Sequence, residues 1–263
     1  MLSSLRALFN LLQQQRPENL GVSKANPVLK TIFERRTIRN FKPDPIPEEI
    51  LRLITDSARY APSGVNLQTY SLLILRANEW VQKTKVQLPF GAPLNILLLG
   101  DFHKIRLAID INIEAPMAEF SIALVNASLA AQNIVLAAHS LGLGTAILMD
   151  SPFGLSDSKK LVKDLDLPKH VFPICSILLG YPVGTLPPIP PRIDHEGVVF
   201  SSNYMKQEDL SPIIGSWWKQ FEAAYMISRK KSLRKRLDEH YSPLFIKTEN
   251  SLKETLFRNE SDE

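Results

Sequence analysis

The sequence predicts an α+β protein, built as an α/β sandwich in which helices cover a sheet. The apolar pattern changes along the chain in the order helix, helix, strand, strand, helix, strand, strand. Residues 115–141 are too many for a strand and are rich in alanine and leucine, as in a long, largely buried helix. The composition agrees, because 44% hydrophobic and 22% charged residues in a chain of 263 are typical of an ordinary soluble globular protein.

Two predicted helices follow an appended N-terminal segment. Residues 1–25 form an amphipathic stretch and linker without an acid before Glu18, so an organellar presequence and a peripheral helix both remain open. Asn26 is expected to cap a helix that starts at Pro27 and runs into Arg35. A second helix starts at Pro47, and its expected buried side consists of Ile50, Leu51, Leu53 and Ile54.

Four strands and one long helix come next. The strands are predicted at residues 70–75, 95–99, 145–148 and 172–179. The first two are apolar nearly throughout, so both are expected to be central strands covered on two faces. The long helix should end at Gly142, and its small residues should let another helix approach closely: Ala127, Ala130, Ala131 and Ala138.

The character of the chain changes beyond Tyr204. Residues 217–240 predict one amphipathic helix, and six of the eight residues from Arg229 to Arg236 are basic. The polar tail from Thr248 is expected to fray. The predicted organisation is therefore an extension (1–25), a core domain (26–208) and a helical C-terminal extension with a frayed tail (209–263).

Several classes of site are excluded. The net charge of +4 comes without a nucleic-acid-binding motif, and no segment reads as a membrane span. The lone Cys175 excludes an internal disulfide and predicts a buried thiol. No histidine pair has metal-ligand spacing, and the histidines and the carboxylates of Asp110, Glu114 and Glu119 are expected to be structural, solvated or surface groups. No catalytic side chain and no metal site is predicted, which is the pattern expected where a bound cofactor supplies the chemistry.

Three arginines lie within five positions, at Arg35, Arg36 and Arg39. A guanidinium group binds phosphate through two hydrogen bonds and stays charged at any working pH. In an extended segment, Arg35, Thr37 and Arg39 would point to one side, and Arg36 and Ile38 to the other. An anion site and a solvated helix end therefore both remain open on the residues alone.

The pair Gly142 and Gly144 does not make a dinucleotide-binding fingerprint. That motif needs a third glycine, where this chain has Ile147, and it leads from a strand into a helix. Here the pair follows a helix and precedes a strand. A helix C-cap explains at least one of the two glycines, and close approach to a ligand is a role for the other.

Four sequence blocks in order resemble the FMN-dependent nitroreductase family. They are ERRTIRNFKPDPIPEEIL, ARYAPSGVNLQTY, LAAQNIVLAAHSLGLGT and LPKHVFPICSILLGYP, and the resemblance covers the chain from about Pro27 to Tyr204. It implies a homodimer with a mixed sheet flanked by helices, the long helix in the dimer contact, and FMN in two clefts between the subunits.

The resemblance also implies roles for individual residues. Arg35 and Arg192 would bind the FMN phosphate, Arg36 and Thr37 would line the ribityl chain, and Arg39 would lie near the N1–C2 edge of the ring. The other subunit would cover the ring with Pro62, Ser63, Gly64, Asn66 and Gln68. The far side of the pocket would be closed by Gly142, Leu143 and Gly144.

The implied activity is transfer of hydride from NADH or NADPH to flavin N5, and then of two electrons to a nitroarene, quinone or enone, by a ping-pong mechanism in the cytoplasm. The chain departs from the family at Thr69-Tyr70, where Pro-Trp is frequent, at Asn126, where an aspartate is usual, and at residues 149–152 near the N5 edge. Two alternatives remain. One is a flavin-consuming or dehalogenating relative. The other is an interaction module in which Trp217, Trp218, Phe221 and the basic run meet an anionic membrane, instead of packing over a partner subunit.

Overall fold

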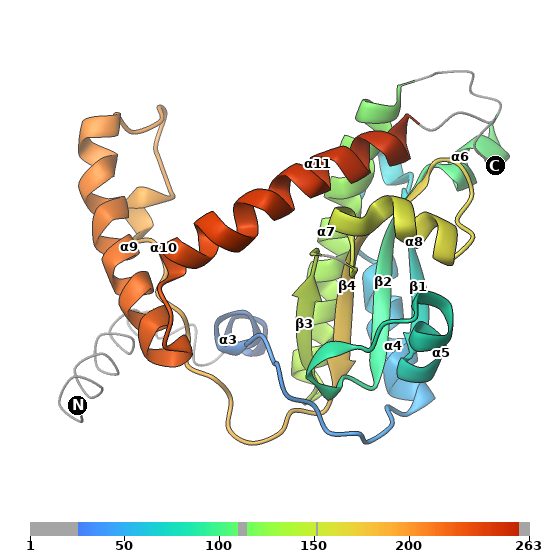
Figure 1. Cartoon of the computed structure of the whole chain (residues 1–263), viewed down its shortest axis with the longest axis horizontal. Coiled ribbons are helices and arrows are strands. Elements are labelled where there is room, and N and C mark those ends of the chain that lie inside the picture. Colours follow the sequence, from blue (N-terminus) through green and yellow to red (C-terminus); the bar gives the residue numbers. More distant parts are fainter. Residues whose placement is uncertain (1–25, 110–114, 151, 258–263) are drawn as a thin grey trace. The chain divides into compact units, whose positions relative to one another are not determined.

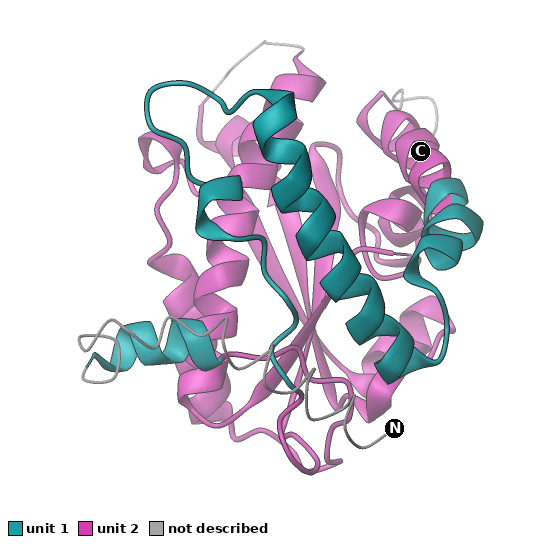
Figure 2. Ribbon diagram, turned by 90° about the vertical axis from the view of Figure 1, so that its left-hand side faces the viewer, with its two compact units in different colours: residues 1–34, 188–243 teal, residues 35–187, 244–263 magenta. Residues whose placement is uncertain are grey.

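The computed structural model describes residues 26–109, 115–150 and 152–257 (Figure 1). The chain forms two compact units, Met1–Glu34 with Pro188–Pro243, and Arg35–Pro187 with Leu244–Glu263 (Figure 2). The expected presequence or peripheral helix in residues 1–25 lies outside the described residues, and the division at residues 26 and 209 stays a prediction.

A four-stranded sheet forms the centre of the second unit. Its strands are β1 (Tyr70–Arg76), β2 (Leu94–Asp101), β3 (Gly144–Leu148) and β4 (Val171–Gly180), in the order β1-β2-β4-β3. All neighbouring pairs are antiparallel, and an isolated parallel bridge joins Thr37 to Thr145 beside β3. All four predicted strands are therefore confirmed.

The expectation that the first two strands are both central is wrong for β1. Strand β2 is buried along its whole length, but β1 is an edge strand and Ile74 on it is 38% exposed. Leu72 packs against one core cluster and Leu73 against the other. The apolar run of β1 therefore indicates side chains that pack on both faces of the sheet. It does not indicate whether another strand pairs with the outer edge of β1.

Helices cover both faces of the sheet (Figure 1). On one face lie α4 (Glu48–Arg59) and α7 (Pro116–Ser140), and on the other lie the short α5 (Ala77–Thr84) and α8 (Ser158–Asp164). The four alanines predicted to permit close approach are all buried in α7, and α4 packs against that helix. Leu53, expected on the buried side of α4, is instead 59% exposed, because Leu51, Ile54 and Ala58 form that side.

Both predicted ends of helices are confirmed. Helix α3 (Pro27–Glu34) begins at the Asn26 cap, whose Oδ1 accepts hydrogen bonds from the amides of Val28 and Leu29 over 3.0 and 3.1 Å. Helix α7 ends at Ser140, and Gly142, two residues later, has the φ of +79° that stops it. Shorter helices complete the described chain: η1 (Gly64–Asn66), η2 (Pro89–Gly91), α6 (His103–Ala108), η3 (Leu155–Asp157) and η4 (His195–Gly197).

The single helix predicted over residues 217–240 is wrong. Helix α9 (Gln207–Arg229) stops where Lys230 adopts φ 54°, and α10 (Leu233–Arg236) restarts after the cap Ser232. The Glu222 carboxylate accepts hydrogen bonds from the Ser232 hydroxyl over 2.7 Å and from the Leu233 amide over 3.2 Å. These bonds stabilise the break, which a basic run in a helical pattern does not reveal.

The polar tail continues as a helix. After η5 (Leu237–Tyr241), α11 extends over Ser242–Leu256, past Thr248, where fraying was expected. Thr255 is 7% exposed, and Leu252 and Leu256 pack against the core of the second unit, which accounts for its order.

Among the described residues, α7 is the one helix long and apolar enough to cross a membrane. It packs against α4 and the sheet, and 44% of its most apolar stretch is buried. This is the packing of a core helix.

Candidate functional site

The arginine segment, residues 35–39, runs beside β3. Thr37 bridges to Thr145, and the Ile38 amide donates a hydrogen bond to the Thr145 carbonyl over 2.9 Å. Ile38 is 5% exposed and belongs to the core cluster on the α5 and α8 face, whereas Arg39 is exposed. The alternation predicted for an extended segment is thus seen at these two residues.

Gly142 and Gly144 follow α7, and the structure requires a glycine at each position for a different reason. Gly142 has φ +79° and ends the helix, while the Leu143 amide reaches back to the Ala138 carbonyl over 2.9 Å. Gly144 has no such backbone requirement. A Cβ at Gly144 would lie 2.5 Å from Cγ1 of Ile38, so the arginine segment can run this close to β3 only beside a glycine.

Arg36 has backbone partners. Its Nη1 donates to the Arg35 carbonyl over 2.9 Å, and its Nε donates to the Pro187 carbonyl over 3.2 Å. Arg35 and Arg36 are half-buried. Arg36 therefore ties the segment to residue 187, a role that the local sequence could not reveal because the partners are 151 residues apart.

Arg192 lies in the other unit and is exposed. The residue before it, Pro191, is buried, and its carbonyl accepts a hydrogen bond from Nε1 of Trp217 over 3.2 Å. Helix α9 thereby holds the segment that carries Arg192. Trp217 also stacks on Phe221, with ring centroids 5.4 Å apart.

The predicted covering loop, residues 62–68, is exposed and strained. Three of its non-glycine residues have positive φ: 50° at Val65, 57° at Asn66 and 49° at Gln68. Such values are uncommon outside glycine, and for a β-branched side chain they are outliers. Val65 is also 94% exposed. Strain of this kind persists where the surroundings impose it, and it is frequent at binding sites.

The loop is tied at both ends to Asn126 of α7. The Gly64 amide donates to Asn126 Oδ1 over 3.3 Å, and Asn126 Nδ2 donates to Thr69 Oγ1 over 2.8 Å. Asn126 is 2% exposed and Thr69 is fully buried. The sequence marked Asn126 only as a departure from the family pattern, and the spacing of 57 and 62 residues gave no local signal for these bonds.

The chain that follows the loop is fixed as well. Lys104 Nζ donates to the Tyr70 carbonyl over 2.7 Å, and the Tyr70 hydroxyl donates to the Ala58 carbonyl at the end of α4 over 2.8 Å. Burial raises the pKa of the Tyr70 phenol, against an opposing effect of Arg59, so the hydroxyl keeps its proton.

The arginine segment and the loop lie at different levels of α7. The loop is tied at Asn126, and the arginine segment crosses β3 just after the helix ends at Ser140. Fourteen residues of α-helix span roughly 21 Å. The exposed apolar residues of this helix include Ile122, Val125 and Leu129.

These surroundings fit the FMN that the sequence resemblance implies. The arginine segment supplies guanidinium groups, which suit a phosphate. A Cβ at Gly64 would meet no atom within 4 Å, so this exposed part of the loop faces open space. Among the described residues, no group of three or more histidines, cysteines and carboxylates could hold a metal ion.

The expectation that Glu119 is a surface charge is wrong. Glu119 is 9% exposed, pairs with Arg106 and lies 3.0 Å from Nδ1 of His170. Burial lowers the pKa of His170 more strongly than Glu119 raises it. Asp110 and Glu114 lie outside the described residues.

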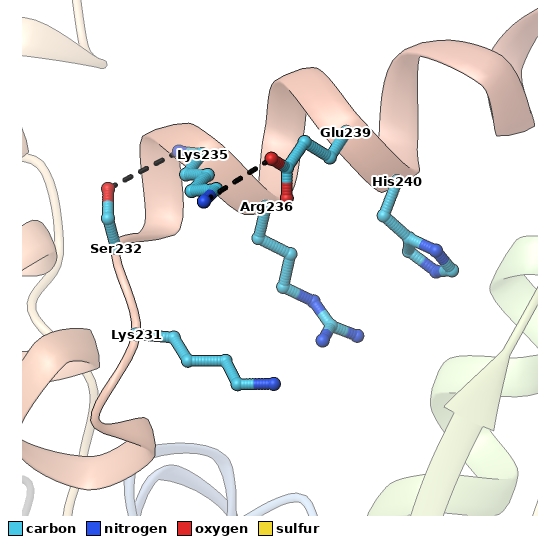
Figure 3. A pocket seen from close by; sticks show the side chains of 6 residues that line it. All are labelled: Lys231, Ser232, Lys235, Arg236, Glu239 and His240. Atoms are coloured by element: carbon cyan, nitrogen blue, oxygen red, sulfur yellow. Dashed lines mark hydrogen bonds and ion pairs between the residues drawn. The ribbon is translucent and has the colours of Figure 1, made fainter.

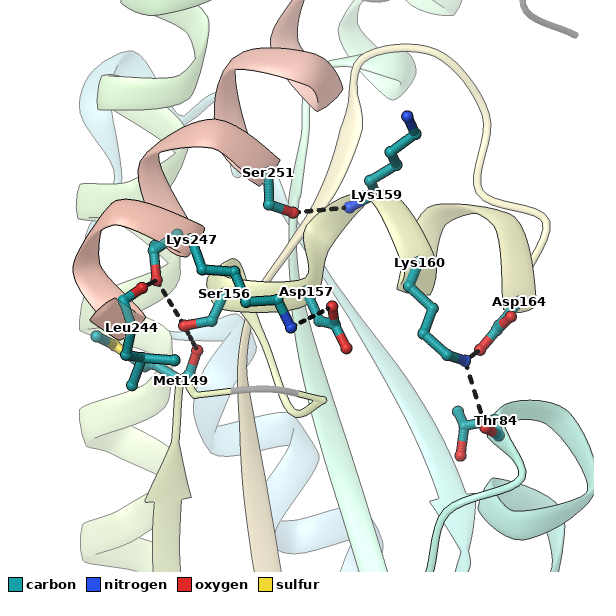
Figure 4. A network of polar contacts seen from close by, with 11 residues as sticks. Thr84, Met149, Ser156, Asp157, Lys159, Lys160, Asp164, Leu244, Lys247 and Ser251 are labelled. Carbon is teal, nitrogen blue, oxygen red and sulfur yellow. Dashed lines mark hydrogen bonds and ion pairs between the residues drawn. The ribbon is translucent and has the colours of Figure 1, made fainter. Parts of the chain in front are cut away.

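Helix α11 is anchored to the stretch that the resemblance places near the N5 edge (Figure 4). The Ser156 hydroxyl lies 3.0 Å from the Met149 carbonyl and 2.7 Å from the Thr248 hydroxyl, and Lys247 pairs with Asp157 over 2.9 Å. The sequence missed this anchor, since a polar C-terminal tail gives no sign of where it docks.

A hollow of about 480 Å³ opens on the first unit, beside the basic run (Figure 3). Lys235 pairs there with Glu239 over 3.5 Å, and Arg236 lies over the Tyr241 ring. None of the expected flavin-binding residues lines it; the lining consists of Lys231, Ser232, Lys235, Arg236, Glu239 and His240.

Comparison with known proteins identifies the family of this chain. The model of the nitroreductase family matches residues 32–83 and 78–181. The FMN reductase (NAD(P)H) of Bacillus subtilis is 28% identical over 219 residues, 78% of this chain and 84% of that protein. The oxygen-insensitive NADPH nitroreductase of Salmonella typhimurium is 25% identical over 229 residues, 84% of this chain and 92% of that protein.

A solved structure shares the fold. NfrA1 of B. megaterium superposes with a TM-score of 0.73 at 24% identity, over 88% of this chain and 99% of that one. The family match extends over more than half of the sequence and includes both the arginine segment and the loop. This chain belongs to the nitroreductase family.

Proposed function

We propose that this chain is an FMN-dependent oxidoreductase that takes electrons from NADH or NADPH and gives them to an electron-poor organic acceptor. Bound FMN supplies the redox chemistry, by accepting hydride at N5 and passing two electrons to a nitroarene, quinone or enone in a ping-pong cycle. The observation that carries the proposal is the family match over residues 32–181, which contains the arginine segment and the strained loop. A cytoplasmic location remains a prediction.

The residues of the arginine segment and Arg192 have different roles in the proposed binding of FMN. Arg35 would bind the phosphate, and the family resemblance gives Arg192 the same role; two guanidinium groups would suit a dianion. Thr37 lines the ribityl chain together with Arg36, which also holds the segment through its backbone partners. The Arg39 guanidinium would lie near the N1–C2 edge of bound FMN, where a cation would stabilise negative charge on the reduced ring.

The remaining binding residues close the pocket from two sides. Gly142, Leu143 and Gly144 fix the end of α7 against the arginine segment, as the contact between Gly144 and Ile38 supports. The loop covers the ring from a second copy of the chain with Pro62, Ser63, Gly64, Asn66 and Gln68.

The separation of these two halves along α7 supports a homodimer. Roughly 21 Å of α7 lies between Asn126, where the loop is tied, and Ser140, where the helix ends before the strand beside the arginine segment, and this favours a site shared by two copies. The exposed apolar residues Ile122, Val125 and Leu129 offer a face through which two copies of α7 can pair. The loop of one copy then reaches the arginine segment of the other.

Mixed dimers test this arrangement. Copies carrying Arg35→Ala and copies carrying Asn66→Ala and Gln68→Ala should each bind FMN weakly as homodimers. Refolded together, they should regain one tightly bound FMN per mixed dimer, because one of the two sites is then intact. No gain on mixing would show that each site is built from one chain.

The activity itself is tested by absorption. The purified protein, or the apoprotein reconstituted with FMN, should show the flavin spectrum and release FMN on denaturation. Anaerobic mixing with NADH or NADPH should bleach it. A protein that stays colourless after reconstitution would refute the flavin proposal, and flavin that neither donor bleaches would favour a flavin-consuming relative.

The interaction-module alternative receives less support. Trp217 and Phe221 are half-buried and stack on one another inside the first unit, and Trp217 is hydrogen-bonded to Pro191. These aromatic side chains are therefore used within the fold. Flotation with anionic liposomes, of the full-length chain, is expected to leave the protein unbound.

A further inference from the structure

Asn126 is a buried polar side chain for which none of the expected flavin contacts accounts. It is 2% exposed at the middle of α7. Its oxygen accepts from the Gly64 amide over 3.3 Å, and its nitrogen donates to the Thr69 hydroxyl over 2.8 Å. The side-chain amide of Asn126 is therefore hydrogen-bonded to the chain near both ends of the loop. Its oxygen and its nitrogen each make one of these two bonds.

Besides these two bonds, the loop is held from outside by Lys104, whose Nζ donates to the Gln68 carbonyl over 3.4 Å. Its internal hydrogen bonds from backbone amides join Asn66 and Gln68 to Ser63, over 3.0 and 3.1 Å, and Leu67 to the Gly64 carbonyl over 3.0 Å. The side chains from Val65 to Gln68 are exposed, yet three of these four residues have positive φ. An exposed segment in this conformation needs an external restraint, since left-handed backbone is unfavourable for non-glycine residues.

We propose that Asn126 is a positioning residue that holds residues 63–68 in the shape that covers FMN. The inference rests on the proposed function for the identity of the ligand, but its structural half concerns this chain alone. Without the Asn126 amide, the Gly64 amide loses its acceptor and the buried Thr69 hydroxyl loses its donor. The strained residues then relax, and the covering surface is no longer preformed.

The chemistry of an amide suits this place. A carboxylate at residue 126 could also accept from Gly64 and from the Thr69 hydroxyl, because a hydroxyl turns to donate or accept. It would, however, place a negative charge at a site that is 2% exposed. Asn126→Asp is therefore the conservative variant, which keeps both bonds, whereas Asn126→Leu removes both with a side chain of the same branching and the same number of heavy atoms.

Asn133 provides the matched control. It lies two turns further along α7, and its Nδ2 donates to the Ser57 carbonyl of α4 over 2.9 Å. Asn133→Leu thus removes an amide–backbone bond from the same helix without touching the loop. A general loss of stability should follow both leucine variants, but loss of loop shape should follow only Asn126→Leu.

The test compares full-length apoproteins in two measurements. Hydrogen exchange of peptides covering residues 61–70 reports the loop without any cofactor, and titration with FMN, followed by quenching of flavin fluorescence, gives the dissociation constant. Asn126→Leu should speed exchange in the loop and raise the FMN dissociation constant about tenfold or more, which corresponds to about 1.4 kcal/mol. Asn133→Leu should leave both at the parent value, and Asn126→Asp should restore loop protection and most of the FMN affinity.

The outcomes separate this inference from the proposed function. If Asn126→Leu retains the loop protection and FMN affinity of the parent, or if Asn133→Leu weakens FMN equally, Asn126 does not position the loop. If Asn126→Leu does not fold, Thr69→Val removes one of the two bonds and should give an intermediate rise in both readouts. If the parent binds no FMN, the proposed function fails, while the exchange measurement still decides whether Asn126 holds the loop.

Discussion

Gly144→Ala should show that the arginine segment is held against β3 by close contact. A Cβ at residue 144 would lie 2.5 Å from Cγ1 and 2.7 Å from Cβ of Ile38, closer than carbon atoms approach. Ile38 is 5% exposed and packed in the core, so it cannot swing into solvent without loss of burial. The backbone of the arginine segment must therefore move. Overpacking of this kind lowers the free energy of unfolding by about 1–3 kcal/mol. Because the Ile38 Cβ is also too close and moves only with the backbone, we expect a loss in the upper half of that range.

Two other glycines supply controls with different physics. Gly142 has φ +79°, and a Cβ added there would meet no atom within 4 Å, so Gly142→Ala should cost about 1 kcal/mol through backbone strain alone. Gly64 has neither a positive φ nor a neighbour at that distance, and Gly64→Ala should change stability by no more than about 0.5 kcal/mol. Urea unfolding of the apoproteins at one protein concentration gives the three values.

The FMN titration makes the comparison specific. Only Gly144→Ala should move the arginine segment, so it should lose more FMN affinity than Gly142→Ala, whose strain is confined to the turn after α7. The reasoning would be refuted if Gly144→Ala unfolded at the parent urea midpoint and bound FMN as tightly. Equal loss of FMN in the two variants would mean that the end of α7, and not the contact with Ile38, matters for binding.

Three further predictions concern single residues. Arg35→Ala should abolish tight FMN binding, while Arg39→Ala should retain FMN and lower its reduction potential, as measured by anaerobic dye titration. Burial lowers the pKa of His170 below the ordinary 6.5, so the unfolded chain binds more protons than the folded chain near that pH. The stability of the protein should therefore fall as the pH drops from 7 through 6.5. The variant His170→Asn, in which asparagine tolerates the φ of 65°, should show a weaker pH dependence of the thermal midpoint. Burial raises the pKa of the Cys175 thiol to about 12, so a disulfide reagent at pH 8 should react at least roughly 100-fold more slowly with native than with denatured protein.

The sequence predicted the elements that carry strong local patterns. The four strands, the Asn26 cap and the Gly142 stop were all readable, because each depends on neighbouring residues. The edge position of β1 was not, because apolar faces and hydrogen-bonding neighbours are independent properties of a strand. The break at Lys230 was also missed, since the Glu222 carboxylate that stabilises the restart lies 10 residues before Ser232, beyond any local helix signal.

The same distinction between local patterns and long-range contacts applies to the candidate site. The arginines and the loop could be named in advance from ordered sequence blocks. Their supports could not, because the supporting contacts join residues that are far apart, such as Arg36 with Pro187 and Asn126 with Gly64. Glu119 was misread for the same reason, because its burial depends on Arg106 and His170, which reach it from other elements.

The position of helix α7 explains why the proposed binding residues are held by contacts with residues that are distant in the sequence. Its buried side packs on α4 and the sheet, its Asn126 holds the loop, and its end at Gly142 leads into the strand against which the arginine segment lies. The two halves of the site are thus set at a fixed separation by one rigid element. A two-fold axis perpendicular to this helix would run two copies in opposite directions and bring the loop end of each to the arginine end of the other. The strain in the loop then has a physical purpose, because a surface that must meet a ligand held by another chain binds more tightly when it is shaped in advance.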